Sequence, residues 1–315
     1  MILDDNSRIS LSNNDSGTSN TVFGKSAGNA IASGGQYNSL FGENSGDALT
    51  TADYNVAIGY GSLGAEETRG TSVAIGYEAL ALQTHASDGA NSENVGIGFQ
   101  AGLRNVTGTG NTSVGFEAMK GASGQSNSNN VAIGKQSLLS VTTGSNNVAV
   151  GYNSLDAGTA VAIGREALNN GDLTSAADGV IGIGYKALYA LTSGADNVAI
   201  GNQALVALTN GVRNVAIGYG AMLDTSGAGD NVGIGYQVLK DGSTSEQNVA
   251  VGNYALGANA AAALTGDANV AVGYKALYVQ QGAAASNTMV GYQAGDGITT
   301  GSENISCDPL ESHPR

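Results

Sequence analysis

Residues 55–60 read NVAIGY, and near-copies of these six letters recur along almost the whole chain. They begin at residues 72, 94, 130, 147, 197, 214, 231, 248 and 269. We index each copy by the glycine that follows its V-A-I core, which gives sixteen units from Gly24 to Gly291. Eight of the fifteen spacings between index glycines are 17 residues. The other spacings differ by whole loop insertions or deletions, which is typical of a solenoid.

The composition limits the classes of protein to which the chain can belong. Of 315 residues, 49 are glycine, 2 are proline and none is tryptophan, so the core is built from small aliphatic side chains. The net charge of −14 disfavours a nucleic-acid partner, because such proteins neutralise phosphates with Lys and Arg. No apolar window reaches the ~18 residues of a membrane span, so we expect no membrane insertion. The single cysteine, Cys307, excludes a disulfide within the chain and a cysteine-based metal site.

Each unit contains one strand and a longer polar connection. V-A-I alternates and is β-branched, which predicts a strand, and the following Ser, Thr, Gly, Asn and Asp residues are typical of turns. The segment between them, such as KALYAL at 186–191, fits either a second short strand or one helical turn, and we favour a helical turn or bend. The fold class predicted is all-β, a parallel β-roll or β-solenoid of about sixteen coils. Residues 1–19 are interpreted as a lead-in, 20–303 as the repeat shaft and 304–315 as a tail.

Alternation along the strand separates a bulky face from a small face. Val56 and Ile58 point to one side, and Ala57 and Gly59 point to the other. We interpret the Val/Ile face as the inside of the coil, and the Ala/Gly face as the place where another copy of the chain packs closely. This interpretation favours an intertwined or side-by-side homotrimer. The interface candidates are Ala57, Gly59, Ala74, Gly76, Ala132, Gly134, Ala149, Gly151, Ala199, Gly201, Ala216 and Gly218.

Two further positions of the repeat predict stacked columns of side chains. Asn stands four residues before the index glycine in thirteen of sixteen units, which favours a ladder of side-chain hydrogen bonds, with a glycan or ion site as the alternative. The residue after the index glycine is aromatic in ten of sixteen units. These rings either pack on one another or stack on sugar rings. The receptor-contact candidates in this column are Tyr60, Tyr77, Tyr152, Tyr219, Tyr236 and Tyr274.

Few residues suggest catalysis or cofactor binding. The G-x-G strings belong to the repeat and do not begin a nucleotide-binding loop. His85 and His313 stand in polar stretches without the partners that a triad or a zinc site needs. The string GKSAG at 24–28 matches the nucleophile-elbow pattern but has no α/β context. We therefore expect no catalytic residue, no cofactor and no metal.

Paired carboxylates are the remaining enzymatic possibility, because glycoside hydrolysis uses two of them. The pairs Glu66/Glu67 and Asp47/Asp53 are available. Each is an isolated loop residue that nothing in the sequence holds in place, so we interpret the chain as a non-enzyme and keep a polysaccharide depolymerase as a minor alternative.

The residues also resemble two known families. SRISLSNNDSGTSNTVFGKSAG at 7–28, followed by the train of repeats, resembles the repeat shaft of bacteriophage tail-fibre proteins, where such repeats commonly precede a self-cleaving intramolecular chaperone. The N-V-A-I-G core is also similar to the head of trimeric autotransporter adhesins, which are left-handed parallel β-roll trimers. The period here is longer than in those heads. Neither a chaperone, nor a membrane-anchor barrel, nor a phage-attachment domain is recognisable.

The resemblance implies a homotrimeric tail fibre of a virion that attaches to a host cell surface. The implied partners are further copies of the chain, a receptor such as a polysaccharide, and other tail or baseplate proteins. Because recognition is usually placed on loops, the longest loops are contact candidates: 82–93, 121–129, 170–179 and 257–268. The alternative is a bacterial surface adhesin or extracellular filament subunit.

Overall fold

The structure is a computed structural model, and it forms two compact units, residues 1–158 and 159–315. It describes residues 9–10, 19–68, 70–84, 91–121, 127–140, 144–155, 160–169, 177–242, 244–257, 266–278, 284–296, 298 and 301–307. All structural statements below concern these residues, and each unit is described by itself.

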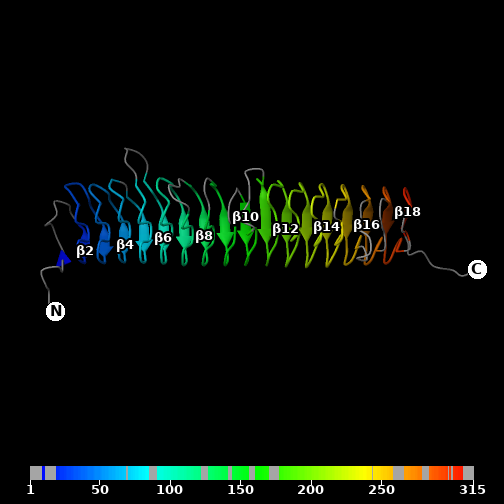
Figure 1. Ribbon diagram of the computed structural model, residues 1–315, viewed down its shortest axis with the longest axis horizontal. Helices are drawn as coiled ribbons and strands as arrows, with labels where there is room; N and C mark the ends of the chain where they lie inside the picture. The colour runs from blue at the N-terminus through cyan, green and yellow to red at the C-terminus, as the bar shows by residue number, and fades with distance from the viewer. Residues whose placement is uncertain are drawn as a thin grey trace, which may run out of the picture. The chain divides into compact units, whose positions relative to one another are not determined.

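The first unit is a stack of coils, each of which contributes one short strand to a sheet (Figure 1). The strands are β1 (Ile9–Ser10), β2 (Thr21–Phe23), β3 (Ser39–Phe41), β4 (Val56–Ile58), β5 (Val73–Ile75), β6 (Val95–Ile97), β7 (Thr112–Val114), β8 (Val131–Ile133) and β9 (Val148–Val150). From β2 onward they pair in parallel and in the register of the repeat, so that Ala57 stands beside Ala74. β1 pairs antiparallel with β2 and thereby covers the free edge of that strand.

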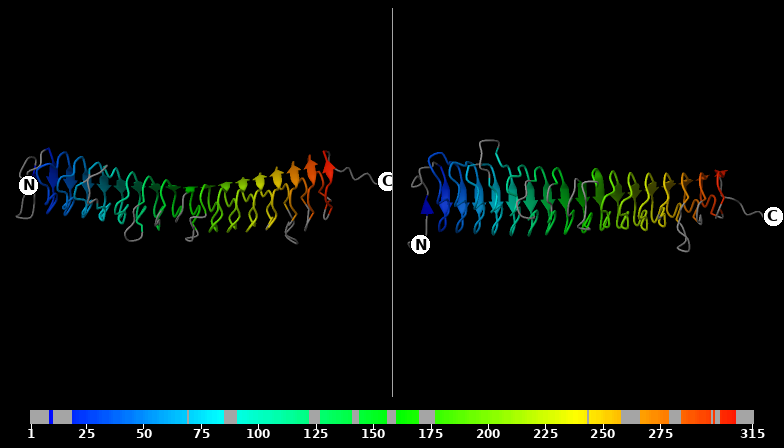
Figure 2. Two further views of the ribbon diagram at one scale, coloured as in Figure 1. Left: turned by 90° about the horizontal axis from the view of Figure 1, so that it is seen from above. Right: turned by 45° about the horizontal axis from the view of Figure 1, so that its top comes forward.

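The second unit has the same architecture. Its strands are β10 (Ala160–Ile163), β11 (Val180–Ile183), β12 (Val198–Ile200), β13 (Val215–Ile217), β14 (Val232–Ile234), β15 (Val249–Val251), β16 (Val270–Val272), β17 (Thr288–Val290) and β18 (Ile305–Ser306). Neighbouring strands are again parallel. In each unit the strands form one side of the coil and the turns form the other (Figure 2).

The predicted fold class is confirmed, because the chain is an all-β parallel solenoid with a period of mostly 17. Each of the sixteen index glycines directly follows one of the strands β2–β17. Of the two possibilities favoured for the segment after the strand, the bend is confirmed and the helical turn is wrong, because no helix occurs among the described residues. In the coil of Gly201, for example, Gln203 and Leu205 have φ of 57° and 50°. A right-handed helix needs consecutive negative φ values, so these left-handed residues make a tight bend instead.

The core of each coil is narrow. In most coils it contains a strand alanine, the residue three positions after the index glycine, which is usually small, and a Leu or Met directly after that residue. Ala199, Ala204 and Leu205 represent the three positions, and all are fully buried. Some coils add a further aliphatic side chain such as Leu208. Because this core contains few atoms per coil, polar groups inside the coil must be hydrogen-bonded for the stack to be stable.

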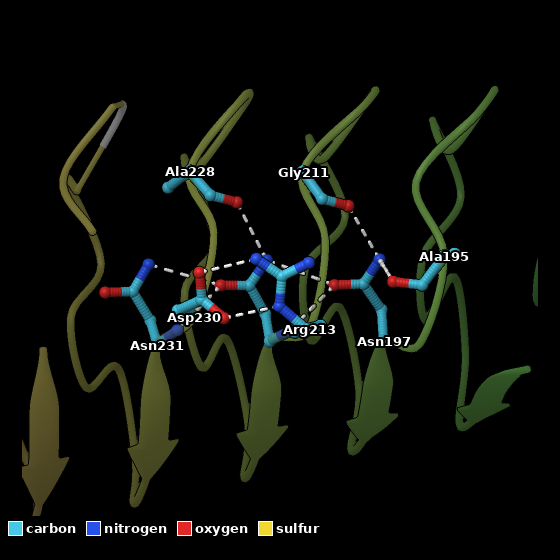
Figure 3. A network of polar contacts seen from close by, with 8 residues as sticks. Ala195, Asn197, Gly211, Arg213, Ala228, Asp230 and Asn231 are labelled. Carbon is cyan, nitrogen blue, oxygen red and sulfur yellow. Dashed lines mark hydrogen bonds and ion pairs between the residues drawn. The ribbon is translucent and has the colours of Figure 1, made fainter. Parts of the chain in front are cut away.

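A ladder of buried asparagines meets that requirement, as predicted (Figure 3). The amide Nδ2 of Asn214 donates to Oδ1 of Asn197 at 3.0 Å and to the carbonyl of Ala228 at 2.8 Å. Its own Oδ1 accepts from the backbone N–H and the side-chain Nδ2 of Asn231. The same pattern continues through Asn248, and an equivalent ladder runs through the first unit. Each asparagine therefore fixes its coil to both neighbours.

Candidate interaction surface

The structure reverses the predicted roles of the two strand faces. Ala57 is 0% exposed inside the coil of its own chain, whereas Ile58 is 39% exposed. The other alanines proposed as interface residues are equally buried, namely Ala74, Ala132, Ala149, Ala199 and Ala216. Because these values apply to a single chain, the alanines have no surface left for a second copy. The prediction that they contact a sister chain is wrong.

The small residues are required by packing within the chain. Gly96 occupies the alanine position of its strand, and a Cβ built there would lie 2.7 Å from Cγ of Leu80. The coil interior is therefore too narrow for Val or Ile opposite the buried leucine.

The index glycines are explained in the same way. Gly59 has a φ of 124°, and a Cβ on it would lie 2.5 Å from the carbonyl oxygen of Gly76 in the next coil. The sequence correctly indicated a close approach of backbone at these positions, but the nearby backbone is the next coil of the same chain. Gly76, Gly134, Gly151, Gly201 and Gly218 have the same conformation.

In each of the two compact units the outward face of the sheet is an apolar surface, which we call the stripe. It consists of the residues three and one before each index glycine, for example Val56 and Ile58. In all sixteen sequence repeats these two positions hold Val, Ile, Phe, Thr or Ser, and none is charged. The residue one before the glycine is the more exposed of the two, as in Ile133 at 41%. Contiguous apolar surface of this kind marks interaction sites in soluble proteins.

The aromatic column runs beside the stripe, one residue after each index glycine. The structure places all six receptor-contact candidates on the surface, namely Tyr60, Tyr77, Tyr152, Tyr219, Tyr236 and Tyr274. In the first unit Tyr60, Tyr77, Phe99 and Phe116 form a row with centroids 5.1–5.3 Å apart and nearly parallel planes. Nζ of Lys135 lies 5.6 Å from the Phe116 ring, and so continues the row as a cation–π contact.

This row presents ring edges to its surroundings. Parallel stacking covers both faces of an inner ring such as Tyr77, which lies between Tyr60 and Phe99. A sugar ring stacks on an aromatic face, not on an edge. Of the two interpretations of the aromatic column, packing of rings on one another therefore describes the first unit.

The second unit breaks the row at two asparagines, Asn202 and Asn253. Parallel pairs remain on either side of Asn253, with Tyr219 on Tyr236 and Tyr274 on Tyr292, each at 5.3 Å. Oδ1 of Asn253 accepts a hydrogen bond from the backbone N–H of Tyr236. At this break Tyr254 contacts its neighbours edge-on.

Charged side chains on the surface pair mostly between coils. Arg213 holds Asp230 of the next coil with two hydrogen bonds of 2.6 and 2.7 Å (Figure 3). This guanidinium lowers the pKa of the Asp230 carboxyl by hydrogen bonding and by charge. The pKa of the Asp241 carboxyl is shifted in the opposite direction: burial raises it, and the nearby carboxylate of Asp224 raises it further. Such pairs add little stability individually, but they favour one register between coils.

Of the acidic pairs considered for catalysis, Glu66 and Glu67 do not face the same side of the chain. Glu66 is fully buried and Glu67 is exposed, so the two carboxylates lie on opposite sides of the chain. Glu66 accepts from Gln83 at 2.8 Å and from Ser92 at 3.3 Å. Asp53 accepts a backbone hydrogen bond from Gln36. Among the described residues, no cluster of three His, Cys, Asp or Glu side chains could hold a metal. The same residues contain no helix long and apolar enough to cross a membrane.

Some sequence-based candidates lie outside the described residues. These include His85, His313 and most of the four long loops at 82–93, 121–129, 170–179 and 257–268. The sequence analysis also missed two groups of residues. One is the buried group around Glu66, which occurs where Ser72 interrupts the asparagine column. The other is a tyrosine cluster around Lys275, whose signal is a Tyr in place of Glu or Gln two residues after an index glycine.

Comparison with protein-family models, with curated proteins and with solved structures finds no match.

Proposed function

We propose that this chain is the shaft of a homotrimeric fibre of the bacteriophage tail type, which attaches a virion to a host cell surface. The observation that supports the proposal most strongly is the stripe, an uncharged and exposed apolar surface repeated in every coil. A partner that covers such a surface must present apolar groups with the same spacing. A second copy of this chain presents apolar groups at the same spacing, because its coils carry the same strands at the same intervals.

The trimer and the setting of the fibre follow from the family resemblance. Three stripes that face a common axis bury one another and leave the turns, the loops and the outer side chains free for contact. Attachment then arises from many weak contacts to a surface glycan, multiplied by three chains and by several fibres in each particle. One end of the fibre would bind other tail or baseplate proteins.

Light scattering tests the oligomer. The chain has a mass of 31.2 kDa, and we expect the protein in solution to have about three times that mass. The double variant Ile58→Lys, Ile133→Lys places charges on two exposed stripe residues and should yield monomers. The control Ser33→Lys, Thr51→Lys adds the same charge at exposed positions outside the stripe and should remain trimeric. A monomeric native protein, or stripe variants that still assemble, would contradict the proposal.

Cell binding tests the attachment function. Fluorescently labelled protein should bind to a subset of strains in a panel of bacteria, and its monomeric stripe variant should bind much more weakly because multivalency is lost. Soluble reducing ends released from capsule or lipopolysaccharide would indicate a depolymerase instead. If no strain is bound, the attachment function is rejected whatever the oligomeric state.

A further inference from the structure

Beside the break in the aromatic column at Asn253 lies a group of partly exposed tyrosines that differs from the stacked rows. Tyr254 stands two residues after its index glycine, and its ring meets Tyr236, Tyr274 and Tyr278 at interplanar angles of 72°, 87° and 84°. The centroid distances are 5.3–6.2 Å. None of these three contacts is a parallel stack. Tyr254 and Tyr278 are both partly exposed.

Glycine at one position creates the space for this cluster. A Cβ on Gly257 would lie 3.4 Å from the Tyr278 ring and 3.0 Å from the carbonyl of Tyr254. Tyr278 therefore lies over the backbone of the preceding coil, beside Tyr254. A larger side chain at residue 257 would lift the ring away from the cluster.

A lysine completes the group. Nζ of Lys275 lies 4.8 Å from the Tyr278 ring, 5.5 Å from Tyr274 and 5.9 Å from Tyr254. Among the described residues Lys275 takes part in none of the ion pairs. It is thus a cation surrounded by aromatic rings and without a bound carboxylate.

A second lysine at the same repeat position gives a matched comparison. Lys186 also contacts two tyrosines, at 5.5 Å from Tyr185 and 4.9 Å from Tyr189. However, its Nζ lies 3.4 Å from Glu166, which occupies the same position in the preceding coil. Lys275 has Tyr254 at that place. Because Tyr254 stands where Glu166 stands beside Lys186, Lys275 lacks the ion pair that Lys186 makes and has one more aromatic ring beside it.

From this arrangement we infer that Tyr254, Tyr278 and Lys275 form a binding subsite for an acidic sugar residue of a polysaccharide, such as a hexuronate. The apolar C–H face of a pyranose packs on the exposed part of the Tyr254 or Tyr278 ring, tyrosine hydroxyls hydrogen-bond the sugar hydroxyls, and Lys275 binds the carboxylate. The net negative charge of the chain does not oppose this contact strongly, because exposed charges beyond ~8 Å are screened at physiological salt. The inference rests on the proposed attachment function and assigns it one ligand class and one location.

Titration of the full-length protein with trigalacturonate tests the inference, with maltotriose as the neutral probe of equal length. Because the chain contains no tryptophan, tyrosine fluorescence reports the binding directly. We expect trigalacturonate to bind and maltotriose to bind about tenfold more weakly, since it lacks the carboxylates that pair with Lys275. Lys275→Gln should remove that preference, and Tyr254→Ala should weaken both probes about tenfold.

Matched variants separate recognition from damage to the fold. Lys186→Gln removes a lysine from the same repeat position and should leave trigalacturonate binding unchanged. Lys275→Glu reverses the charge of a partly exposed side chain and should abolish trigalacturonate binding. Equal affinity for the two sugars, no binding by the native protein, or full binding by Lys275→Glu would overturn the inference.

The subsite and the attachment function can fail separately. If trigalacturonate does not bind but labelled protein still binds bacteria, the subsite is wrong and the attachment function stands. If trigalacturonate binds as expected but no strain is bound, the subsite stands and the attachment function is rejected.

Discussion

At the scale of single residues, this chain depends on backbone conformations that L-amino acids rarely adopt. Each coil has an index glycine with φ between 124° and 146°, as well as left-handed residues with side chains such as Leu205. Each left-handed residue other than glycine costs ~1–2 kcal/mol. These bends persist because hydrogen bonds to neighbouring coils fix them, as in the N–H of Leu205, which donates to the carbonyl of Ala221 in the next coil at 3.0 Å.

Gly134→Ala tests the role of the index glycines. Gly134 has a φ of 128°, and a Cβ on it would lie 2.5 Å from the carbonyl oxygen of Gly151. We expect the free energy of unfolding to fall by ~3 kcal/mol in denaturant titrations. Gly61→Ala is the control, because φ there is 59°, the nearest atom would be 3.7 Å away, and Glu78 occupies the same position in the next coil. Similar losses in the two variants would show that conformation alone, without the close backbone contact, sets the cost.

Two aspartates should respond to pH in opposite ways. The pKa of Asp241 is raised by burial in the folded state, so its contribution to stability falls as the pH rises above ~3.8. Asp241→Asn should therefore melt at a higher temperature than the native protein at neutral pH, but not at about pH 3.

The pKa of Asp230 is lowered by Arg213, so that carboxylate stabilises the fold above pH ~3.8 and loses its effect as the pH falls. Asp230→Asn should melt lower at neutral pH, and melting curves in which both variants shift alike would contradict these assignments.

At the scale of the element, the coil is held to its neighbours by polar ladders as well as by its core. The strands are three or four residues long in β2–β17, too short to be stable alone. The asparagine column supplies two or three buried hydrogen bonds per coil in addition to the backbone pairs. Where Ser72 replaces asparagine, Gln83 donates to Ser72 and accepts from Asn94, and so bridges the interruption. A gap in the column is thus filled by another amide.

Asn214→Leu removes one member of the ladder at nearly constant size. The change removes the side-chain donor to the carbonyl of Ala228 and the side-chain acceptor for the backbone N–H of Asn231, whereas Oδ1 of Asn197 keeps the backbone N–H of residue 214. Buried groups without partners cost ~1–3 kcal/mol each, so we expect a loss of several kcal/mol in the free energy of unfolding. Asn304→Leu, at the exposed end of the same column, should cost far less. Equal effects at the two positions would show that the ladder adds no stability.

At the scale of the whole molecule, each unit is a one-dimensional array in which a coil contacts only its neighbours. Strand contacts within a unit occur only between strands adjacent in the stack. The stability of such an array is approximately a sum of coil terms and nearest-neighbour terms. Local damage should therefore open a few coils and leave distant ones folded.

Ala132→Leu tests both this locality and the assignment of the strand faces. Ala132 is fully buried beside the exposed Ile133, so the larger side chain overfills the coil and should destabilise it by ~1–3 kcal/mol. Hydrogen exchange should accelerate in β7–β9 and remain unchanged in β12–β16. The control Ile133→Leu keeps the outward side chain apolar and should leave exchange unchanged throughout the monomer. Faster exchange across both units in Ala132→Leu would contradict the model of neighbour-only coupling.

The sequence by itself determined the repeat, the strand position, the period and the asparagine ladder. These follow from local periodicity, because a residue recurring at a fixed spacing in stacked coils must stand beside its own copies. The sequence did not determine which strand face is inside. Alternation separates Ala57 from Ile58, but only the tertiary structure shows that Ala57 is buried in the interior together with Leu63, while Ile58 is exposed. The same holds for Lys275, since its freedom from a carboxylate depends on which side chain the preceding coil places beside it.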